Sequence, residues 1–286
     1  MRILLTGKNG QVGSALLASL PALGEVIALD RTQLDLESPD GIRAAVREAR
    51  PQVIVNAAAY TAVDEAERRE AFAFRVNCEA PGVLAEEAKR LGALLVHFST
   101  DYVFDGEKPS PYVESDTPDP LNAYGRSKLA GEQAIQGSGC RHLIFRTSWV
   151  YAPSGNNFML TMLRLAREGR PLRVVDDQYG APTTSLMIAD AVPDAIRSLL
   201  VDRSREGLYH ITAGGRTTWH GFARDIFQAA GVKADLTAIS SREYKALARR
   251  PRNSVLDNHK LGERLHIRMP TWQDGLREVF SVTAWN

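Results

Sequence analysis

Tyr124 and Lys128 form the pair of side chains in this sequence whose spacing points most directly to chemistry. They are four residues apart in the segment Tyr-Gly-Arg-Ser-Lys, so they share one face if the segment is helical. A free tyrosine has a pKa near ~10 and is a poor acid at neutral pH. A neighbouring ammonium lowers that pKa toward the range in which general acids work well. The pair predicts that Tyr124 donates a proton to a carbonyl oxygen as that carbonyl is reduced.

Two hydroxyls and a carboxylate follow the apolar run of residues 94–98. They are Ser99, Thr100 and Asp101. In open α/β sheets, ligands bind just outside the carboxyl ends of strands. We expect Thr100 to hold the carbonyl oxygen as negative charge develops on it, with Ser99 as the alternative hydroxyl. Asp101 either contacts the substrate or caps a turn. The predicted catalytic residues are therefore Tyr124, Lys128 and Thr100.

A glycine-rich turn lies between the first apolar run and the first helical pattern. Its glycines are Gly7, Gly10 and Gly13. The first permits a tight turn, the second lets the backbone approach a pyrophosphate, and the third lets the helix pack closely on the strand. The following residues, Gln11 and Val12, open a helix whose N–H groups favour phosphate. This turn predicts a site for a nicotinamide dinucleotide.

Asp30 and Arg31 give conflicting indications of which dinucleotide is bound. Asp30 ends the second apolar run, 20 residues after Gly10, where a carboxylate accepts hydrogen bonds from the adenosine ribose of NAD. Arg31 follows directly and could pair with the 2′-phosphate of NADP. We therefore keep both NADH and NADPH as candidates. Lys128 is also expected to bind the nicotinamide ribose.

The two-residue gap between the first two glycines resembles the short-chain dehydrogenase/reductase superfamily. In its extended branch, this resemblance implies that Asp35 and Leu36 lie at the adenine. It also implies that small residues after the third strand lie beside the pyrophosphate and the nicotinamide ribose; these are Ala57, Ala58 and Ala59. Small side chains suit a backbone that must approach a cofactor.

The elements that must position these residues alternate along the chain as strand and helix. The expected strands are 3–5, 25–29, 53–55, 94–98, 142–145, 172–175 and 207–212. The expected helices are 11–22, 39–49, 71–91 with a break near Pro81, 124–136, 157–168, 187–200, 218–230 and 257–264. Apolar strands separated by helices predict an α/β fold with a Rossmann-type, doubly wound parallel sheet.

The alternation of strand and helix becomes less regular after residue 149. We expect residues 1–150 to form the NAD(P)-binding Rossmann domain. Residues 151–286 are expected to form mainly a smaller α/β substrate-binding region that is partly interleaved with it. No linker or repeat separates the two parts.

The composition excludes several classes of partner. The chain has 286 residues and a net charge of +1, which gives no reason to expect nucleic acid. It has no apolar run of the ~20 residues that a membrane span needs, and its first apolar run is too short for a signal peptide. We therefore expect a cytoplasmic protein in which Cys78 and Cys140 are free thiols.

Several longer segments together resemble the dTDP-4-dehydrorhamnose reductase family. The residues that carry this resemblance are 7–13, 55–64, 99–106, 146–151, 177–183 and 250–257. The family reduces the C4 keto group of dTDP-4-dehydro-6-deoxy-L-mannose to dTDP-L-rhamnose with NADH or NADPH. The resemblance implies that a nucleotide-linked sugar is the substrate and that Tyr124 is the proton donor.

The resemblance also implies a sugar site lined by Thr100, Asp101 and Trp149. Trp149 follows the fifth strand, where an aromatic ring either packs against a sugar or belongs to the core. The cluster of residues 250–253 could meet the substrate diphosphate, or it could be a solvated run of charges.

A bridging metal is not expected. Some members of similar fold form dimers bridged by magnesium, which is held by carboxylates near the first helix and after residue 183. Ala15 and Leu186 occupy those positions here. We therefore predict no metal, and a homodimer remains possible.

Two alternative functions share parts of this pattern. Sugar-nucleotide epimerases and 4,6-dehydratases use the same glycine turn and Tyr-Lys pair, but Tyr102 stands where a dehydratase has a glutamate. A noncatalytic regulatory subunit, like that of methionine adenosyltransferase, is the other alternative. The presence of Tyr124, Lys128 and Thr100 weighs against this regulatory alternative.

Overall fold

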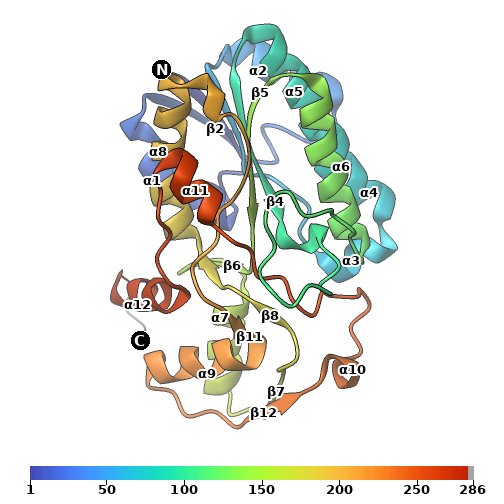
Figure 1. The fold of residues 1–286 in the computed structure, drawn as a ribbon, viewed down its shortest axis with the longest axis vertical. Helices are drawn as coiled ribbons and strands as arrows, with labels where there is room; N and C mark the ends of the chain where they lie inside the picture. The colour runs from blue at the N-terminus through green and yellow to red at the C-terminus, as the bar shows by residue number, and fades with distance from the viewer. Residues whose placement is uncertain (283–286) are drawn as a thin grey trace.

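A six-stranded parallel sheet forms the centre of the computed structural model, which describes residues 1–282 (Figure 1). Its strand order is β10-β5-β4-β3-β1-β2, and every neighbouring pair is parallel. The strands are β1 (Arg2–Thr6), β2 (Glu25–Leu29), β3 (Val53–Asn56), β4 (Leu94–Thr100), β5 (Arg141–Thr147) and β10 (Gly207–His210). The predicted Rossmann-type α/β fold is confirmed.

The central strands are mostly apolar and buried because helices cover both faces of the sheet. On β1, Ile3 and Leu5 point into one buried cluster and Leu4 into the other. One face carries α1 (Gln11–Ser19) and α8 (Ser185–Val201). The other face carries α2 (Pro39–Ala49), α5 (Ala80–Leu91) and α6 (Ala123–Ser138). Figure 1 shows these two helical layers on either side of the sheet.

The helix expected over 71–91 is divided earlier than Pro81. It consists of α4 (Glu70–Phe74), a π-helical turn (Arg75–Glu79) and α5. The wider turn places Asn77 so that its side chain accepts from Tyr60 N at 2.8 Å and donates to Tyr60 O at 3.0 Å. Pro81 falls in the first turn of α5, where its missing N–H is tolerated. The π-helical turn thus lies just before Pro81, and its Asn77 side chain ties the helix to Tyr60.

The second half of the chain forms a smaller cluster below the sheet. Its helices are α7 (Phe158–Arg167), α9 (Trp219–Ala230) and α12 (Trp272–Val282). Three short strand pairs brace it: β6 (Val150–Tyr151) with β9 (Thr183–Thr184), β8 (Tyr179–Gly180) with β11 (Thr217–Thr218), and β7 (Leu172–Val175) with β12 (Leu236–Ile239). The sequence analysis did not anticipate β12 or α12.

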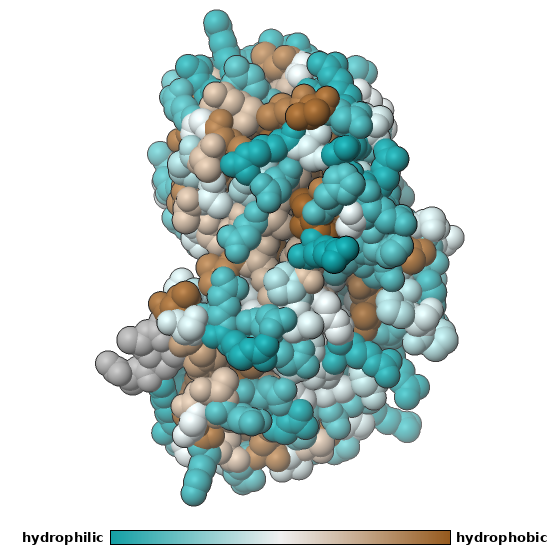
Figure 2. Space-filling view, turned by 60° about the vertical axis from the view of Figure 1, so that its left-hand side comes forward, coloured by the Kyte–Doolittle hydropathy of each residue, from teal (hydrophilic) through white to brown (hydrophobic). Residues whose placement is uncertain are grey.

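The remaining elements are short or return to the sheet. They are α3 (Val63–Arg68), α10 (Ser241–Tyr244) and α11 (His259–Leu265). α8, β10 and α11 come from the second half of the chain yet pack with the Rossmann sheet. Within residues 1–282, no helix combines the length and hydropathy needed to cross a membrane. Figure 2 shows a face on which hydrophilic residues predominate and hydrophobic ones form small separate groups.

Candidate active site

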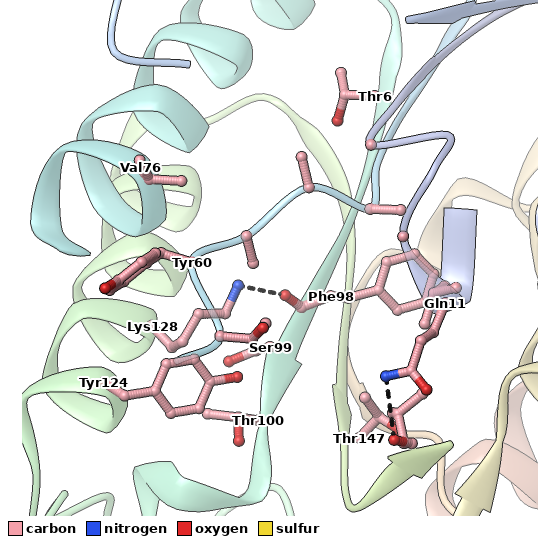
Figure 3. A pocket seen from close by; sticks show the side chains of 18 of the residues that line it. Thr6, Gln11, Tyr60, Val76, Phe98, Ser99, Thr100, Tyr124, Lys128 and Thr147 are labelled. Carbon is pink, nitrogen blue, oxygen red and sulfur yellow. Dashed lines mark hydrogen bonds between the residues drawn. The ribbon is translucent and has the colours of Figure 1, made fainter. Parts of the chain in front are cut away.

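One cavity of about 850 Å³ runs along the carboxyl ends of the central strands. Its walls come from the glycine turn, the ends of β2 to β5 and the start of α6 (Figure 3). Residues 154–156 and Trp219 contribute from the second half of the chain. Nearly all of the predicted site residues therefore lie around one space, at the edge where α/β sheets bind ligands.

The glycine turn is built for close backbone approach. Gly7 has a φ of 72°, and a Cβ atom there would lie 2.8 Å from the backbone of Ala58. A Cβ atom on Gly13 would lie 2.1 Å from the carbonyl oxygen of Gly7. Gly13 is the one predicted cofactor residue that does not line the cavity, because it lies beneath the turn. Gly10 precedes α1 and supplies no side-chain cap, so the turn fits a pyrophosphate.

Asp30 lines the cavity, and its carboxylate already has partners within the chain. Thr32 Oγ1 donates to Asp30 at 2.6 Å, and Lys8 Nζ lies 3.2 Å from it. These contacts lower the pKa of Asp30 to about 2, with the Thr32 hydrogen bond as the largest cause. Arg31 is exposed, and its guanidinium lies 3.7 Å from Glu37. Lys8 and Arg31 thus place two cationic side chains beside Asp30.

The other predicted cofactor residues also line the cavity. They are Gln11, Val12, Asp35, Leu36, Ala57, Ala58 and Ala59. Asp35 additionally accepts a hydrogen bond from the N–H of Glu37 at 3.0 Å. It therefore stabilises its own turn as well as facing the cavity.

Tyr124 and Thr100 lie side by side at the inner end of the cavity (Figure 3). Burial raises the pKa of Tyr124 to about 12, against a hydrogen bond with Thr100 that lowers it. The Tyr-Lys spacing predicted that Lys128 lowers this pKa; the pKa is raised instead, because burial is the largest cause. Tyr124 consequently keeps its proton at neutral pH, as a proton donor must.

Lys128 is held in place by contacts with β4. Its Nζ donates to the carbonyl oxygen of Phe98 at 2.6 Å and lies 3.2 Å from Nε2 of His97. Burial lowers the pKa of Lys128 to about 8, and the charge of Glu132 opposes this shift. The lysine therefore exchanges between ammonium and amine close to neutral pH.

Thr100 and Asp101 are linked to each other in this structure. The hydroxyl of Thr100 donates to Asp101 Oδ1 at 3.0 Å and accepts from the N–H of Tyr102 at 3.1 Å. Burial raises the pKa of Asp101 to about 7, against hydrogen bonds with Ser254 and Thr100. Thr100 must turn its hydroxyl away from Asp101 before it can donate to a substrate oxygen.

Trp149 lines the cavity but is not free to stack on a sugar. Its ring stacks on Trp219 with centroids 3.6 Å apart and planes inclined by 5°. Gly180 also lies against this indole, since a Cβ atom there would come within 2.4 Å of Trp149 Cε2. Trp149 has a φ of 46°, a left-handed conformation that these neighbours maintain. A sugar would meet the edge of Trp149 unless Trp219 moves.

The predicted diphosphate cluster is placed outside the cavity. Arg250 forms an ion pair with Asp64 at 2.8 Å, and the N–H of Ala248 donates to the same carboxylate at 2.9 Å. Asn253 donates to the carbonyl oxygens of Lys108 and Ser110 at 2.7 and 3.1 Å. In this structure the segment fastens a C-terminal loop to the first half of the chain.

Several lining residues escaped the sequence analysis. Trp219, Phe72 and Tyr60 all line the cavity. Phe72 lies on α4, and the guanidinium of Arg69 lies 4.3 Å from its ring centroid. Trp219 opens α9, far along the chain from every motif, and no local pattern marks it. The alternation of strands and helices along the sequence predicted a helix near Phe72, but it did not predict which face of that helix lines the cavity.

The positions of Ala15 and Leu186 carry no carboxylate. Both are partly buried apolar residues that pack against core clusters. Within residues 1–282, no group of three or more His, Cys, Asp or Glu side chains is arranged to hold a metal ion.

Comparison with known proteins gives the family. Residues 1–284 match the family model described as RmlD substrate binding domain. A dTDP-4-dehydrorhamnose reductase of Burkholderia thailandensis is 49% identical over 285 residues, covering 96% of each chain. One of Shigella flexneri is 46% identical over 298 residues, covering 99% of this chain and 100% of the relative. This chain belongs to the dTDP-4-dehydrorhamnose reductase family.

A solved structure of the same family agrees with this fold. The dTDP-4-dehydrorhamnose reductase of Bacillus anthracis, in complex with NADP, superposes with a TM-score of 0.93 at 36% identity and covers 99% of both chains. The resemblance predicted from the motifs is confirmed, and the chain is an oxidoreductase of the NAD(P)-dependent class.

Proposed function

We propose that this reductase converts the C4 keto group of dTDP-4-dehydro-6-deoxy-L-mannose to the alcohol of dTDP-L-rhamnose, using NADPH or NADH. The observation that carries the proposal is the convergence of Tyr124, Lys128 and Thr100 on the cavity that also contains the glycine turn. Curated relatives that match nearly the full chain carry the name of this activity.

The cofactor would lie in the cavity, along the carboxyl ends of the strands. The turn at Gly7 and Gly10 would receive the pyrophosphate, and residues 57–59 would lie beside it. Asp30 and Arg31 would meet the adenosine ribose. When bound, the dinucleotide supplies the hydride. The NADP complex of the Bacillus anthracis relative supports this choice of cofactor.

The proton would come from Tyr124. Its hydroxyl is protonated at neutral pH because burial raises its pKa to about 12. As negative charge develops on the C4 oxygen, Tyr124 gives up its proton, and Lys128 in its ammonium form stabilises the phenolate that remains. Thr100 donates a hydrogen bond to the same oxygen after leaving Asp101. Asp101 and the edge of Trp149 would hold the sugar.

The second half of the chain would hold most of the substrate. Residues 154–156 and Trp219 bring it to the rim of the cavity. We propose that residues 1–150 serve mainly the cofactor and that residues 151–286 serve mainly the nucleotide sugar, with α8 and β10 built into the first part.

The test follows NAD(P)H oxidation by absorbance, with the keto sugar generated by a 3,5-epimerase. The wild-type enzyme should turn over, and Tyr124→Phe should lose roughly 10²-fold to 10⁴-fold in kcat while still binding cofactor. Unchanged turnover in Tyr124→Phe would show that Tyr124 is not the proton donor. A wild-type protein that binds cofactor without turnover would favour the epimerase or regulatory alternative.

A further inference from the structure

A row of buried polar side chains runs from Lys128 back toward the glycine turn. Thr6 Oγ1 donates to Asn56 Oδ1 at 2.7 Å, and Asn56 Nδ2 lies 3.1 Å from His97 Nδ1. His97 Nε2 in turn lies 3.2 Å from Lys128 Nζ. None of the four residues is more than 1% exposed. Water cannot compensate a mismatched contact here, so the direction of each hydrogen bond matters.

His97 is an uncharged imidazole in this row. Burial and the charge of Lys128 keep the pKa of His97 well below 6.5. A neutral imidazole carries one hydrogen, so one ring nitrogen donates and the other accepts. Asn56 Nδ2 can only donate, and His97 Nδ1 must therefore accept from it. The ring hydrogen then lies on Nε2 and points at Lys128.

This arrangement suits Lys128 as an amine. A lone pair on Nζ can accept the hydrogen of His97 Nε2, whereas an ammonium has only donors. The amine is accessible because burial lowers the pKa of Lys128 to about 8. Other titratable groups near Lys128 are Glu132, which favours the ammonium and is itself paired with Arg146 at 2.6 Å, and Tyr124 on the same helix.

The ammonium form requires the row to run in the opposite direction. Lys128 would donate to Nε2, His97 Nδ1 would donate to Asn56 Oδ1 after the amide turns over, and Nδ2 would donate to Thr6. Both directions keep a donor opposite an acceptor at each contact of the row, since a threonine hydroxyl can donate or accept. If only part of the row reversed, two hydrogens would point at each other across one buried contact. The row cannot conduct a proton, because a side-chain amide does not exchange its protons as an acid near neutral pH.

We propose that His97 is a positioning residue which, oriented by Asn56 and Thr6, aims Lys128 at the active site and couples its charge to reversal of this row. The proposal rests on the proposed function, in which Lys128 serves Tyr124. Lys128 becomes an ammonium only when the His97 tautomer and the Asn56 amide reverse with it. The row thereby links the catalytic pair to Thr6 at the end of β1, which also lines the cavity.

The first test observes the tautomer directly, by ¹⁵N NMR of protein labelled in its histidines. His97 should change from the Nε2–H to the Nδ1–H tautomer as the pH falls through the pKa of Lys128, about 8, without becoming an imidazolium. In Lys128→Met the change should vanish, because methionine cannot take up a proton. A single tautomer throughout in the wild type, or the same change in Lys128→Met, would overturn the coupling.

The second test uses two substitutions of His97 that differ in reach. Glutamine can place an amide where Nε2 lies, whereas asparagine reaches only the position of Nδ1. His97→Asn should lower kcat by roughly tenfold to a hundredfold, leave the substrate KM within about threefold, and move the alkaline limb of the kcat profile to higher pH. His97→Gln should recover most of kcat and the wild-type limb.

Equal behaviour of the two variants, with a wild-type pH profile, would reduce His97 to a packing role. Thr6→Val is the milder variant if His97→Asn fails to fold, and it should lower kcat in the same way by a smaller factor; an unchanged kcat and profile there would contradict the proposal. Absence of turnover in the wild type would instead contradict the proposed function, while the NMR test would still decide the inference.

Discussion

Arg31 decides little about the fold but much about which dinucleotide the cavity accepts. Its side chain is 76% exposed and its ion pair with Glu37 is long at 3.7 Å, so it can exchange this contact for a 2′-phosphate. The carboxylate of Asp30 beside it already contacts Thr32 and Lys8. It is therefore less available to accept a hydrogen bond from a ribose hydroxyl. The residues on this rim therefore favour NADPH over NADH.

Replacing Arg31 with alanine should raise the KM for NADPH by about tenfold and leave that for NADH nearly unchanged. One charge-assisted hydrogen bond to phosphate is of that size. Initial rates with each cofactor measure the change. Arg68→Ala is the matched control, because Arg68 is comparably exposed and pairs with Glu65 outside the cavity. An equal loss with both cofactors would contradict this assignment.

Asp101 should make the protein less stable as the pH rises. In the folded protein its pKa is raised to about 7 from 3.8, so the native state keeps a proton that the unfolded chain has lost. Stability therefore falls as the pH rises through about 4 to 7. Between pH 5 and 8 the loss amounts to roughly 2 to 3 kcal/mol. Urea unfolding of the wild type and Asp101→Asn at both pH values measures it.

The asparagine variant cannot titrate and serves as the reference. Its free energy of unfolding should decline less than that of the wild type over this range. Parallel pH dependence in the two proteins would show that Asp101 is ionised throughout.

The packing of α6 depends on one glycine opposite the π-helical turn. A Cβ atom on Gly131 would lie 2.1 Å from the carbonyl oxygen of Asn77, whereas one on Gly137 would meet nothing within 4 Å. Gly131→Ala should destabilise the protein by about 2 kcal/mol or more, since backbone must move. Gly137→Ala on the same helix should be neutral or stabilising by up to ~1 kcal/mol. Denaturant unfolding compares them, and similar values would contradict the packing argument.

The elements that the sequence predicted best are those with a strong local pattern. The first residues of β3 and β4 and the middle of β1 form apolar runs, at residues 53–55, 94–96 and 3–5, because both faces of the sheet are buried there. The glycine turn follows β1. β12 was missed because its middle residues, Thr237 and Ala238, are exposed. An irregularity near Pro81 was predicted, but its π-helical form and the contact of Asn77 with Tyr60 were not, because that contact joins separate segments.

In the candidate site, too, residues in local motifs were predictable and contacts between distant segments were not. Tyr124, Lys128 and Thr100 were predictable because motif and strand end fix them locally. The stacking of Trp149 on Trp219 joins the ends of distant elements, so spacing could not reveal it. The raised pKa of Tyr124 also depends on burial that forms only in the folded chain.

The two halves of the molecule are joined through the core of the sheet. Ile188, Val192 and Ile196 of α8 belong to the same buried cluster as Leu16 of α1. β10 extends the sheet beyond β5. The sequence predicted a strand near β10 but not its place in the sheet, since strand order arises from long-range pairing.

A fragment of residues 1–150 should therefore fail to fold cooperatively. It would expose the face of α1 and the edge of β5 that α8 and β10 cover. Circular dichroism with thermal unfolding tests this, with the full chain as control. A sharp transition in the fragment would show that the first half is an independent domain.

The stacked pair of Trp149 and Trp219 also gives the molecule its own optical reporter. Two indoles in face-to-face contact at 3.6 Å share their excitation and emit differently from separated ones. Trp272 is buried away from the cavity, and Trp285 lies outside the described residues; a Trp149→Phe variant, which lacks the stacked pair, gives their contribution. A ligand that separates the two indole rings would change the fluorescence emission even when no reaction takes place. Substrate occupancy could then be followed by fluorescence in an enzyme that is not turning over.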